Sequence, residues 1–277
     1  MRYSPKRELK RFLDEDVGKS DITSKLLEKK KITARIITRE DTIVAGTKFV
    51  KDIFSLKKCR IKIQKKDGKL AKANQTILDI SGDAGNILTC ERTALNLLSR
   101  MCGIATQTNN LKKQIKKTGS KSKLFATRKT APGLRFFDKE AVKAGGGEKH
   151  RMTLNEMIMI KDNHLVVENS IEDILRKAKR TKGKIEIEVE TQRDAILCAE
   201  LGADIIMLDN FTPVQIKKTI RKLKELKLRN KVLLEASGRI NSRNIVKYAK
   251  TNVDMISVGS ITNSCLLYTS PSPRDRG

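Results

Sequence analysis

The sequence predicts an α/β protein with a mixed α/β segment up to about residue 110, followed by repeated strand–loop–helix units. Short apolar strands are expected near Leu124, Met157, Ile185, Asp204, Val232 and Asp254, with helical patterns between them. Their spacing of roughly 20 to 30 residues is typical of βα units in a parallel sheet. Six such units suggest a closed α/β barrel, in which the chemistry lies at the carboxyl ends of the strands.

The first segment predicts both helices and strands. LKRFLDEDVGKSDIT is an amphipathic helix that runs into a loop. KITARIITREDTIVAG predicts two strands around a charged turn, and IKIQKKDGKLAKANQTILDISGDA predicts two more, with Asp67 and Gly68 marking a turn. After Gly85 the pattern becomes helical, and Leu95, Leu98 and Met101 recur on one side of that helix.

Composition favours a reducing cytoplasm and no membrane span. No apolar run approaches the ~20 residues that a spanning helix needs, and no apolar segment follows the basic N-terminus as in a secretory signal. The five cysteines are odd in number, scattered and never in C-x-x-C spacing. This cysteine pattern argues against both a disulfide framework and a zinc site.

The net charge of +27 is extreme and allows anionic substrates, nucleic acid or a membrane surface as partners. The basic clusters are spread from end to end, at Lys29–Lys31, Lys57–Lys58, Lys65–Lys66, Lys112–Lys117, Lys177–Lys184 and Lys217–Lys231. Only three Tyr and no Trp are present for base stacking. We interpret most of the charge as a solvated lysine-rich surface and expect no specific nucleic-acid partner.

The stretch from Leu124 to His164 carries the strongest functional signal. It holds both histidines of the chain, three consecutive glycines, and two expected strand ends that lead into Arg128-Lys129 and Lys161. Any one of these residues taken alone has a plain structural interpretation, such as a surface lysine. Together, cations placed on loops just past strand ends are typical of a site for a polyanionic small molecule.

Carboxylates follow on the next two strands. IEIEVE alternates, which places Glu186, Glu188 and Glu190 on one face of a strand, either an exposed edge or a row facing the site. ADIIMLDN ends in Asp209, which can cap the helix that begins at Thr212 or can, with Glu190, hold Mg²⁺ or ribose hydroxyls.

The last two strands end in turns suited to phosphate. VLLEASG and DMISVGS each finish in Ser and Gly, and glycine lets backbone N–H groups approach a phosphate closely. The last strands of an α/β barrel often form such a site.

The motifs TRKTAPGLR, GGGEKHRM and IKDNH resemble the signature of the quinolinate phosphoribosyltransferase family, and the resemblance extends from about Leu9 to Ser264. It implies an N-terminal α/β sandwich plus an incomplete α/β barrel, in an interlocked homodimer or a higher multiple of dimers. It also implies transfer of phosphoribosyl from phosphoribosyl pyrophosphate to quinolinate with decarboxylation. The expected cofactor is Mg²⁺, with no organic cofactor.

The same resemblance implies a role for each matching residue. The quinolinate ligands would be Arg128, His150, Arg151 and Lys161, with Arg92 entering from a partner chain. Lys129 would serve the pyrophosphate, beside Thr127, while Glu190 and Asp209 would bind the ribose hydroxyls and the metal. The 5′-phosphate would lie against Ser237, Gly238, Gly259 and Ser260. The catalytic residues would then be Lys129, Glu190 and Asp209.

Two departures and two alternatives accompany this expectation. Arg239 stands where the family has a second glycine, and from Cys265 the tail CLLYTSPSPRDRG lacks the family's closing strand. The expected domains are therefore 1–110 for the sandwich, 111–264 for the barrel and 265–277 for an atypical tail. A related enzyme acting on another aromatic acid shares nearly every motif. A basic nucleic-acid-binding protein is indicated by charge alone.

Overall fold

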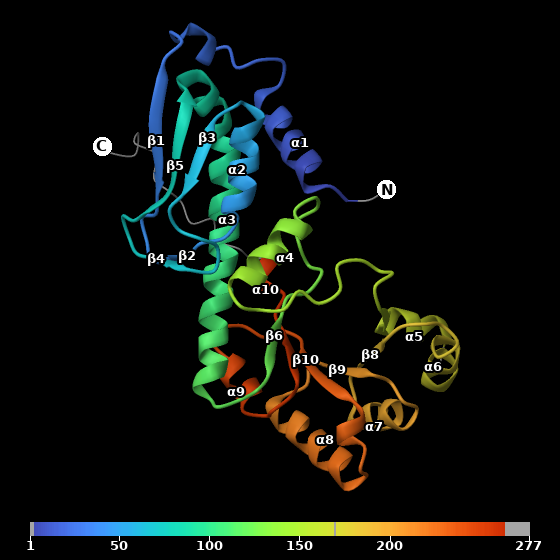
Figure 1. The fold of residues 1–277 in the computed structure, drawn as a ribbon. Helices are drawn as coiled ribbons and strands as arrows, with labels where there is room; N and C mark the ends of the chain where they lie inside the picture. The colour runs from blue at the N-terminus through green and yellow to red at the C-terminus, as the bar shows by residue number, and fades with distance from the viewer. Residues whose placement is uncertain (1–2, 169, 264–277) are drawn as a thin grey trace. The chain divides into compact units, whose positions relative to one another are not determined.

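The protein was examined as a computed structural model, which describes residues 3–168 and 170–263. Its described residues form two compact units, which Figure 1 traces along the chain. The first comprises the residues up to Asn109 together with Thr130–Gly146, and the second comprises Asn110–Lys129 and Gly147–Asn263. The mixed α/β class expected from the sequence is confirmed, and the atypical tail lies outside the described residues.

The first unit contains two small antiparallel sheets. One has the order β1-β5-β3, formed by β1 (Lys31–Ile37), β5 (Thr76–Asp83) and β3 (Arg60–Ile63). The other pairs β2 (Thr42–Ile43) with β4 (Leu70–Ala71). Four strands were thus expected and five are present, and the two strands expected around the charged turn belong to different sheets.

Four helical segments accompany these sheets: α1 (Pro5–Val17), η1 (Ser24–Leu26), α2 (Thr47–Leu56) and α3 (Ala84–Lys117). Helix α1 begins with proline in its first turn, where no backbone donor is lost, and it ends at Gly18, whose φ is 59°. Helix α2 was not predicted. Its sequence TKFVKDIFSL buries Phe49, Val50 and Ile53, so packing against the sheet stabilises it as a helix.

One segment groups differently from the expected domain ranges. Thr130–Gly146, which contains α4 (Arg135–Ala144), belongs to the first unit rather than to the barrel. Phe137 of this segment lies 5.1 Å from the Phe49 ring, edge on, and is fully buried. The neighbouring carboxylate of Asp138 accepts two hydrogen bonds from Arg100 of α3, at 2.7 and 2.8 Å. Aromatic packing and this bidentate ion pair hold the segment to the first unit.

The second unit is built on a six-stranded parallel sheet of order β6-β11-β10-β9-β8-β7. The strands are β6 (Lys123–Phe125), β7 (Ile158–Ile160), β8 (Ile185–Val189), β9 (Ile205–Asp209), β10 (Leu233–Ser237) and β11 (Met255–Ser257). All six lie where the sequence predicted them. Within the described residues β6 and β7 do not pair with each other, so the barrel is incomplete. The family resemblance implied an incomplete barrel, whereas the strand count alone suggested a closed one.

Helices connect these strands, as expected for βα units. They are α5 (Asp162–Glu168), α6 (Ile171–Ala178), α7 (Gln192–Glu200), α8 (Pro213–Glu225), α9 (Ile245–Ala249) and α10 (Ser260–Asn263), with a short turn η2 (Arg229–Lys231). Figure 1 shows α7 and α8 lying beside β8 and β9. Thr212 and Gln215 form a capping box that starts α8 directly after β9.

The described residues can be compared with the expectations for membrane-spanning helices and for the cysteines. Over the described part of the chain, no helix is both long and apolar enough to cross a membrane. Cys59, Cys90, Cys102 and Cys198 are all buried as free thiols, and Cys265 lies outside the described residues. Buried, unpaired thiols agree with the expected absence of a disulfide framework.

Candidate active site

A pocket of about 340 Å³ opens at the carboxyl ends of the strands of the second unit. That volume is within the range of small-molecule sites. The residues that line it are Thr127, Arg128, Lys129, His150, Arg151, Met159, Lys161, Glu188, Met207, Asp209, Glu235, Ser237 and Ser257. Eight of the predicted site residues therefore line the same pocket: Thr127, Arg128, Lys129, His150, Arg151, Lys161, Asp209 and Ser237.

Two of the cations of the pocket, Arg128 and Lys129, lie on the loop that follows β6. Thr127 Oγ1 accepts the N–H of Lys129 at 3.1 Å, and Thr262 donates its hydroxyl to the Lys129 carbonyl at 2.7 Å. These bonds fix the loop on which Arg128 and Lys129 stand. Its geometry follows from the polar TRKT sequence directly after a buried strand.

Arg151 is the most enclosed of these cations, with 9% of its surface exposed. Its Nη1 donates to the Met157 carbonyl at 3.2 Å, and its Nη2 lies 3.1 Å from the Met159 sulfur. Burial lowers the pKa of Arg151, and the nearby charge of Arg128 lowers it further. Two guanidinium groups kept close together in a partly dry pocket favour an anionic ligand between them.

Lys161 follows β7 and forms a short ion pair with Glu188 of β8. Its side chain remains 39% exposed, so it is available on the pocket side. Of the alternating glutamates, Glu188 lines the pocket, whereas Glu190 is exposed one residue beyond β8. The sequence placed this row on the site side but did not single out Glu188.

Asp209 is the last residue of β9 and lines the pocket. Burial raises the pKa of its carboxyl, Lys161 and Lys129 oppose that rise, and Glu190 adds to it. Glu190 is thus near enough to Asp209 to interact electrostatically. The two carboxylates form the kind of hard oxygen donor pair that Mg²⁺ prefers.

Of the predicted phosphate residues, Ser237 lines the pocket, whereas Gly238, Gly259 and Ser260 are not among its lining residues. Gly238 follows Ser237 with φ of 94°, and a Cβ there would come within 2.6 Å of the Asn210 backbone nitrogen. At Gly259 a Cβ would lie 3.2 Å from Lys129 Cδ. Arg239, where the resemblance expects glycine, adopts a left-handed φ of 51°. That conformation explains why glycine is favoured at the position.

A buried cluster of three side chains was not predicted. His150 Nε2 lies 3.3 Å from Glu186 Oε2 and 3.3 Å from Glu235 Oε2, and both carboxylates are fully buried. Burial by itself lowers the pKa of His150, but the two carboxylates outweigh it and raise that pKa. The sequence signal was present: glutamates inside the otherwise apolar strands IEIEV and LLEAS.

Arg92 lies on α3 in the first unit, where its side chain is exposed. Its predicted role from a partner chain stays a prediction, because the structure contains one chain. Gly259 lies between β11 and α10, and Ser260 is the first residue of α10.

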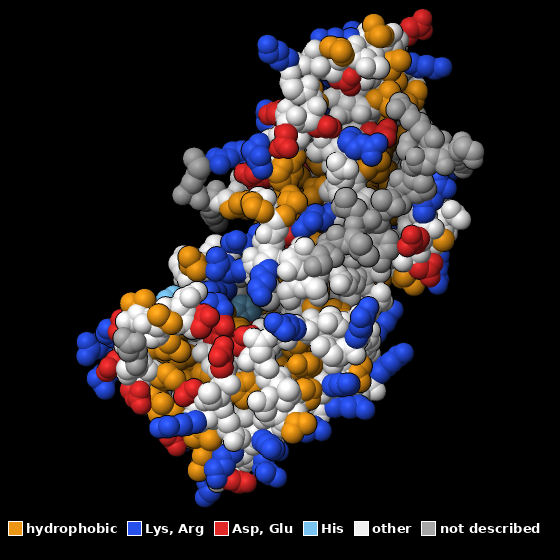
Figure 2. Space-filling model, turned by 180° about the vertical axis from the view of Figure 1, so that it is seen from behind, with side chains coloured by type: hydrophobic (Ala, Val, Ile, Leu, Met, Phe, Trp, Pro, Cys, Tyr) orange, Lys and Arg blue, Asp and Glu red, His pale blue; other side chains and the backbone are white. Residues whose placement is uncertain are grey.

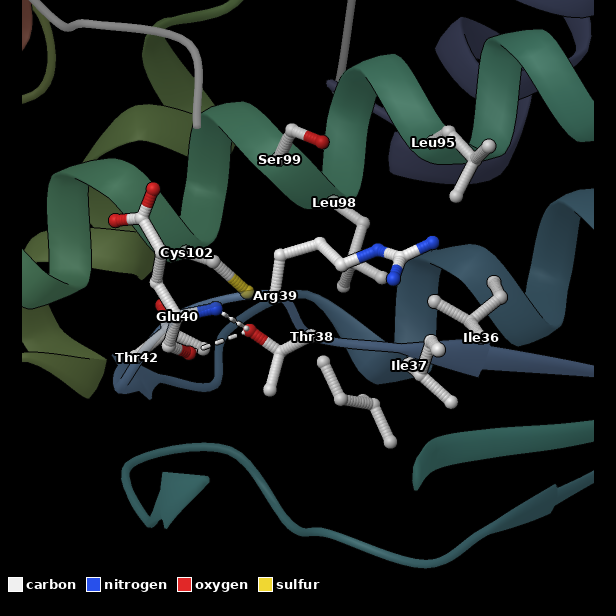
Figure 3. Close-up of a pocket in the computed structure, with 11 residues that line it drawn as sticks. Ile36, Ile37, Thr38, Arg39, Glu40, Thr42, Leu95, Leu98, Ser99 and Cys102 are labelled. Carbon is white, nitrogen blue, oxygen red and sulfur yellow. Dashed lines mark hydrogen bonds between the residues drawn. The ribbon is translucent and has the colours of Figure 1, made fainter. Parts of the chain in front are cut away.

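A smaller pocket of about 50 Å³ lies in the first unit (Figure 3). Most of its wall is apolar, from Ile36, Ile37 and Ile77 on the sheet side and Leu95 and Leu98 on α3. Figure 3 shows Arg39 extending across it while Thr38 bonds to Glu40. It offers too little space for a charged substrate of the size that fits the larger pocket.

Known proteins match the chain along most of its length. Residues 104–267 match the family model described as quinolinate phosphoribosyl transferase, C-terminal domain, and residues 21–102 match its N-terminal domain. Over 244 residues the chain is 40% identical to a protein of Archaeoglobus fulgidus named "Probable nicotinate-nucleotide pyrophosphorylase (carboxylating)", with 88% of this chain and 94% of the relative covered.

Two further relatives agree with these matches. The nicotinate-nucleotide pyrophosphorylase (carboxylating) of Rattus norvegicus is 33% identical over 256 residues, with 91% of this chain and 85% of the relative covered. The solved structure of the nicotinate-nucleotide pyrophosphorylase from Francisella tularensis superposes with a TM-score of 0.87 at 37% identity, with 95% of this chain and 93% of that one covered.

Proposed function

Because the chain belongs to the quinolinate phosphoribosyltransferase family, we propose that it transfers phosphoribosyl from phosphoribosyl pyrophosphate to quinolinate with loss of carbon dioxide. The products are nicotinate mononucleotide, pyrophosphate and carbon dioxide. One observation carries the proposal: a single pocket at the strand ends brings together the guanidinium and ammonium groups of Arg128, Lys129, Arg151 and Lys161 with the carboxylate of Asp209. This combination suits an anionic acceptor beside a sugar with its metal.

The acceptor carboxylates belong with Arg128, Arg151 and Lys161. Guanidinium groups bind carboxylates through paired, charge-assisted hydrogen bonds, and Arg151 is already oriented by its contacts to Met157 and Met159. Lys161 stands opposite, on the loop after β7, with a partly exposed ammonium. His150 lines the same pocket with its side chain 7% exposed, and it would contact the acceptor through that exposed part.

Asp209 and Glu190 would bind the ribose hydroxyls and hold Mg²⁺, since their carboxylates lie at adjacent strand ends and interact electrostatically. Bound Mg²⁺ would neutralise charge on the pyrophosphate as it leaves. Lys129 would contact the same pyrophosphate. Ser237, Gly238, Gly259 and Ser260 would surround the 5′-phosphate, because the tight turn at Gly238 leaves space for a close backbone approach.

The chemistry then needs only positioning and charge. The pyridine nitrogen forms a bond to the anomeric carbon as the bond from that carbon to pyrophosphate breaks. The nitrogen becomes cationic and can accept the electrons left on the ring when the 2-carboxylate departs as carbon dioxide, after which that carbon takes a proton. The protein holds the two reactants in line and stabilises the leaving group through Lys129. No organic cofactor is required.

The assembly and compartment belong to the same proposal. A homodimer would bring Arg92 of one protomer to the acceptor pocket of the other, and the exposed position of Arg92 on α3 is compatible with that role. The free buried thiols support a reducing compartment such as the cytoplasm.

The test is an assay with quinolinate, phosphoribosyl pyrophosphate and Mg²⁺ that scores pyrophosphate and carbon dioxide together. Equal release of both products is expected, and Arg128→Ala should abolish it. Glu200→Gln, an exposed carboxylate at the end of α7, is the matched control and should retain full activity. No product from quinolinate, but pyrophosphate release with another aromatic acid in the same assay, would indicate that acid as the natural acceptor. Inactivity with every acceptor would remove the enzyme assignment and favour a polyanion-binding role.

A further inference from the structure

The carboxylates of Glu186 and Glu235 form a cluster with His150 and have no role in the steps above. His150 and Glu235 line the pocket, whereas Glu186 is not among its lining residues. Glu186 comes from β8 and Glu235 from β10, and both carboxylates are fully buried. Their Oε2 atoms lie 3.3 Å from the same imidazole nitrogen, Nε2. Neither carboxylate has a well-formed hydrogen bond in the described structure. Two buried anions around one imidazole are costly, and such arrangements concentrate at functional sites.

The other ring nitrogen connects this cluster to the pocket. His150 Nδ1 accepts the backbone N–H of Arg151 at 2.8 Å. His150 also adopts a left-handed φ of 53°, a backbone conformation that a residue with a side chain keeps only when its surroundings hold it. The imidazole therefore joins the two glutamates on one side to the backbone of Arg151 on the other.

The hydrogen bond to Nδ1 also determines which ring nitrogen carries the proton when His150 is neutral. A nitrogen that accepts an N–H has no hydrogen of its own, so the neutral ring is protonated at Nε2, between the two carboxylates. These three residues present donor atoms within 4.8 Å of one another, a spacing that a metal ion can also occupy. A protonated Nε2 would exclude a metal ion, because that nitrogen then has no lone pair to donate.

We propose that Glu186 and Glu235 are positioning residues of the acceptor site, which hold the Nε2 proton of His150 and thereby fix the backbone and guanidinium of Arg151. Losing either carboxylate would loosen the strained turn at His150 and let Arg151 move away from the acceptor carboxylate. This role rests on the proposed function for its substrate. The arrangement of the three side chains can be measured without any substrate.

The charged groups that face His150 act in a defined direction. Glu186 on β8 and Glu235 on β10 stabilise positive charge on the imidazole and raise the pKa of His150 although burial lowers it, and Glu186 also faces the positive charge of Arg151. The Arg151 N–H opposes a second proton on Nδ1. Under both influences Nε2 keeps its proton through neutral pH, and each glutamate replaced by glutamine weakens the hold on it.

The first test is nuclear magnetic resonance of the full chain labelled with ¹⁵N-histidine. The chain has only two histidines, so His164→Asn assigns the spectrum. The His150 Nε2 resonance is expected to show a bonded, slowly exchanging proton throughout neutral pH. Glu186→Gln and Glu235→Gln should each speed that exchange and lower the pH at which the ring gains its charge. An Nε2 without a proton, or a stoichiometric metal ion in the purified protein, would overturn the proposal.

The second test separates a positioning role from a merely structural one. Both glutamine variants should raise the dissociation constant of quinolinate about tenfold, leave that of phosphoribosyl pyrophosphate within about twofold, and leave the melting temperature nearly unchanged. Glu200→Gln is the control and should change none of these. Equal weakening of both substrates, or unchanged quinolinate binding, would refute the positioning role.

The two proposals fail in different ways. Wild-type protein that binds no quinolinate contradicts the proposed function, and the positioning role falls with it. Wild-type protein that binds quinolinate, but whose variants bind it equally well, contradicts only the positioning role. If a glutamine variant does not fold, the wild-type resonance experiment still decides whether the carboxylates hold the Nε2 proton.

Discussion

Gly238 shows how one missing side chain shapes the proposed phosphate turn. Its φ is 94°, and the space where a Cβ would stand is taken by Asn210, whose backbone nitrogen lies 2.6 Å away. Asn210 N–H in turn donates to the Ser237 carbonyl at 3.0 Å. The ends of β9 and β10 are therefore in direct contact, and only glycine satisfies both the backbone conformation and the space.

Gly238→Ala should destabilise the protein by about 3 kcal/mol, from the left-handed backbone together with overpacking against Asn210. Gly119→Ala is the matched control, since Gly119 also has a positive φ, 74°, but nothing within 4 Å of the added Cβ. That control should lose only about 1 kcal/mol. Denaturant unfolding measures both, and equal losses would show that the contact with Asn210 is unimportant.

The sequence located residues of the pocket lining where a cation directly follows a strand, and their roles stay predictions. Arg128, Lys129 and Lys161 follow short strands, and directly after a strand end a cation is easily recognised as a site residue. The sequence named Glu186 in the row that could face the site, but it predicted neither its partner nor Glu235, because alternation inside a strand gives a face and not a partner. Their meaning depends on His150, more than thirty residues from one of them and eighty-five from the other, and only the folded sheet brings them together.

Helices and strands were predictable where the spacing of the apolar residues and the length of the segment indicate the same type of element. The six strands of the barrel are short apolar runs with regular spacing, so the sequence located all of them. Helix α2 was missed because its apolar and β-branched residues do not distinguish a helix from a strand by pattern alone. The placement of α4 with the first unit depends on Phe137 meeting Phe49, a contact that no local pattern shows.

The start of α3 offers a test of pH dependence at the scale of an element. Asp21 accepts the Ser24 N–H and the Thr89 hydroxyl, both at 2.9 Å, which joins the η1 turn to that helix. These hydrogen bonds, led by those of Ser24, lower the pKa of Asp21 from 3.8 to about 2. Because the folded pKa is depressed, the stabilisation is present above 3.8 and is lost as pH falls towards 2.

Asp21→Asn should therefore lower the melting temperature at pH about 5, and the gap from wild type should close as the pH falls through that window. Thermal unfolding followed by circular dichroism measures the gap. Glu200→Gln, an exposed carboxylate at the end of α7, is a comparison in the other unit. A gap that stays constant with pH would mean that the Asp21 charge contributes nothing.

At the scale of the whole molecule, charge is the dominant feature. The chain carries 59 Lys and Arg against 32 Asp and Glu. Figure 2 shows the basic side chains scattered over the visible face, with acidic ones among them, rather than gathered in one continuous patch. A scattered surface charge predicts weak, sequence-independent attraction to polyanions and not specific recognition.

Duplex DNA of any sequence should therefore bind at about 50 mM salt and be released by about 200 mM, as counterion release requires. Fluorescence anisotropy with two unrelated duplexes checks this. Binding that differs strongly between the sequences, or that survives the higher salt, would support the nucleic-acid alternative over the enzyme.

Assembly gives a second test at this scale. If Arg92 completes the partner's pocket, mixing Arg92→Ala chains with Arg128→Ala chains creates hybrid dimers in which one site carries both substitutions and the other carries neither. Up to about half of the wild-type activity per hybrid dimer is then expected, whereas each parent alone is inactive. With subunit exchange confirmed by mass spectrometry, a mixture as inactive as its parents would show that sites are not shared between protomers.

The central claim is that the cations of the pocket recognise a dicarboxylate, and comparison of quinolinate with nicotinate tests it most directly. Nicotinate lacks one carboxylate, so a buried cation such as Arg151 would lose its charge-assisted partner. Loss of one member of such a pair costs about 2–5 kcal/mol, which corresponds to roughly 30- to 4,000-fold. At saturating phosphoribosyl pyrophosphate, kcat/KM should favour quinolinate by that factor. Values within a factor of about three would contradict the assignment of the acceptor.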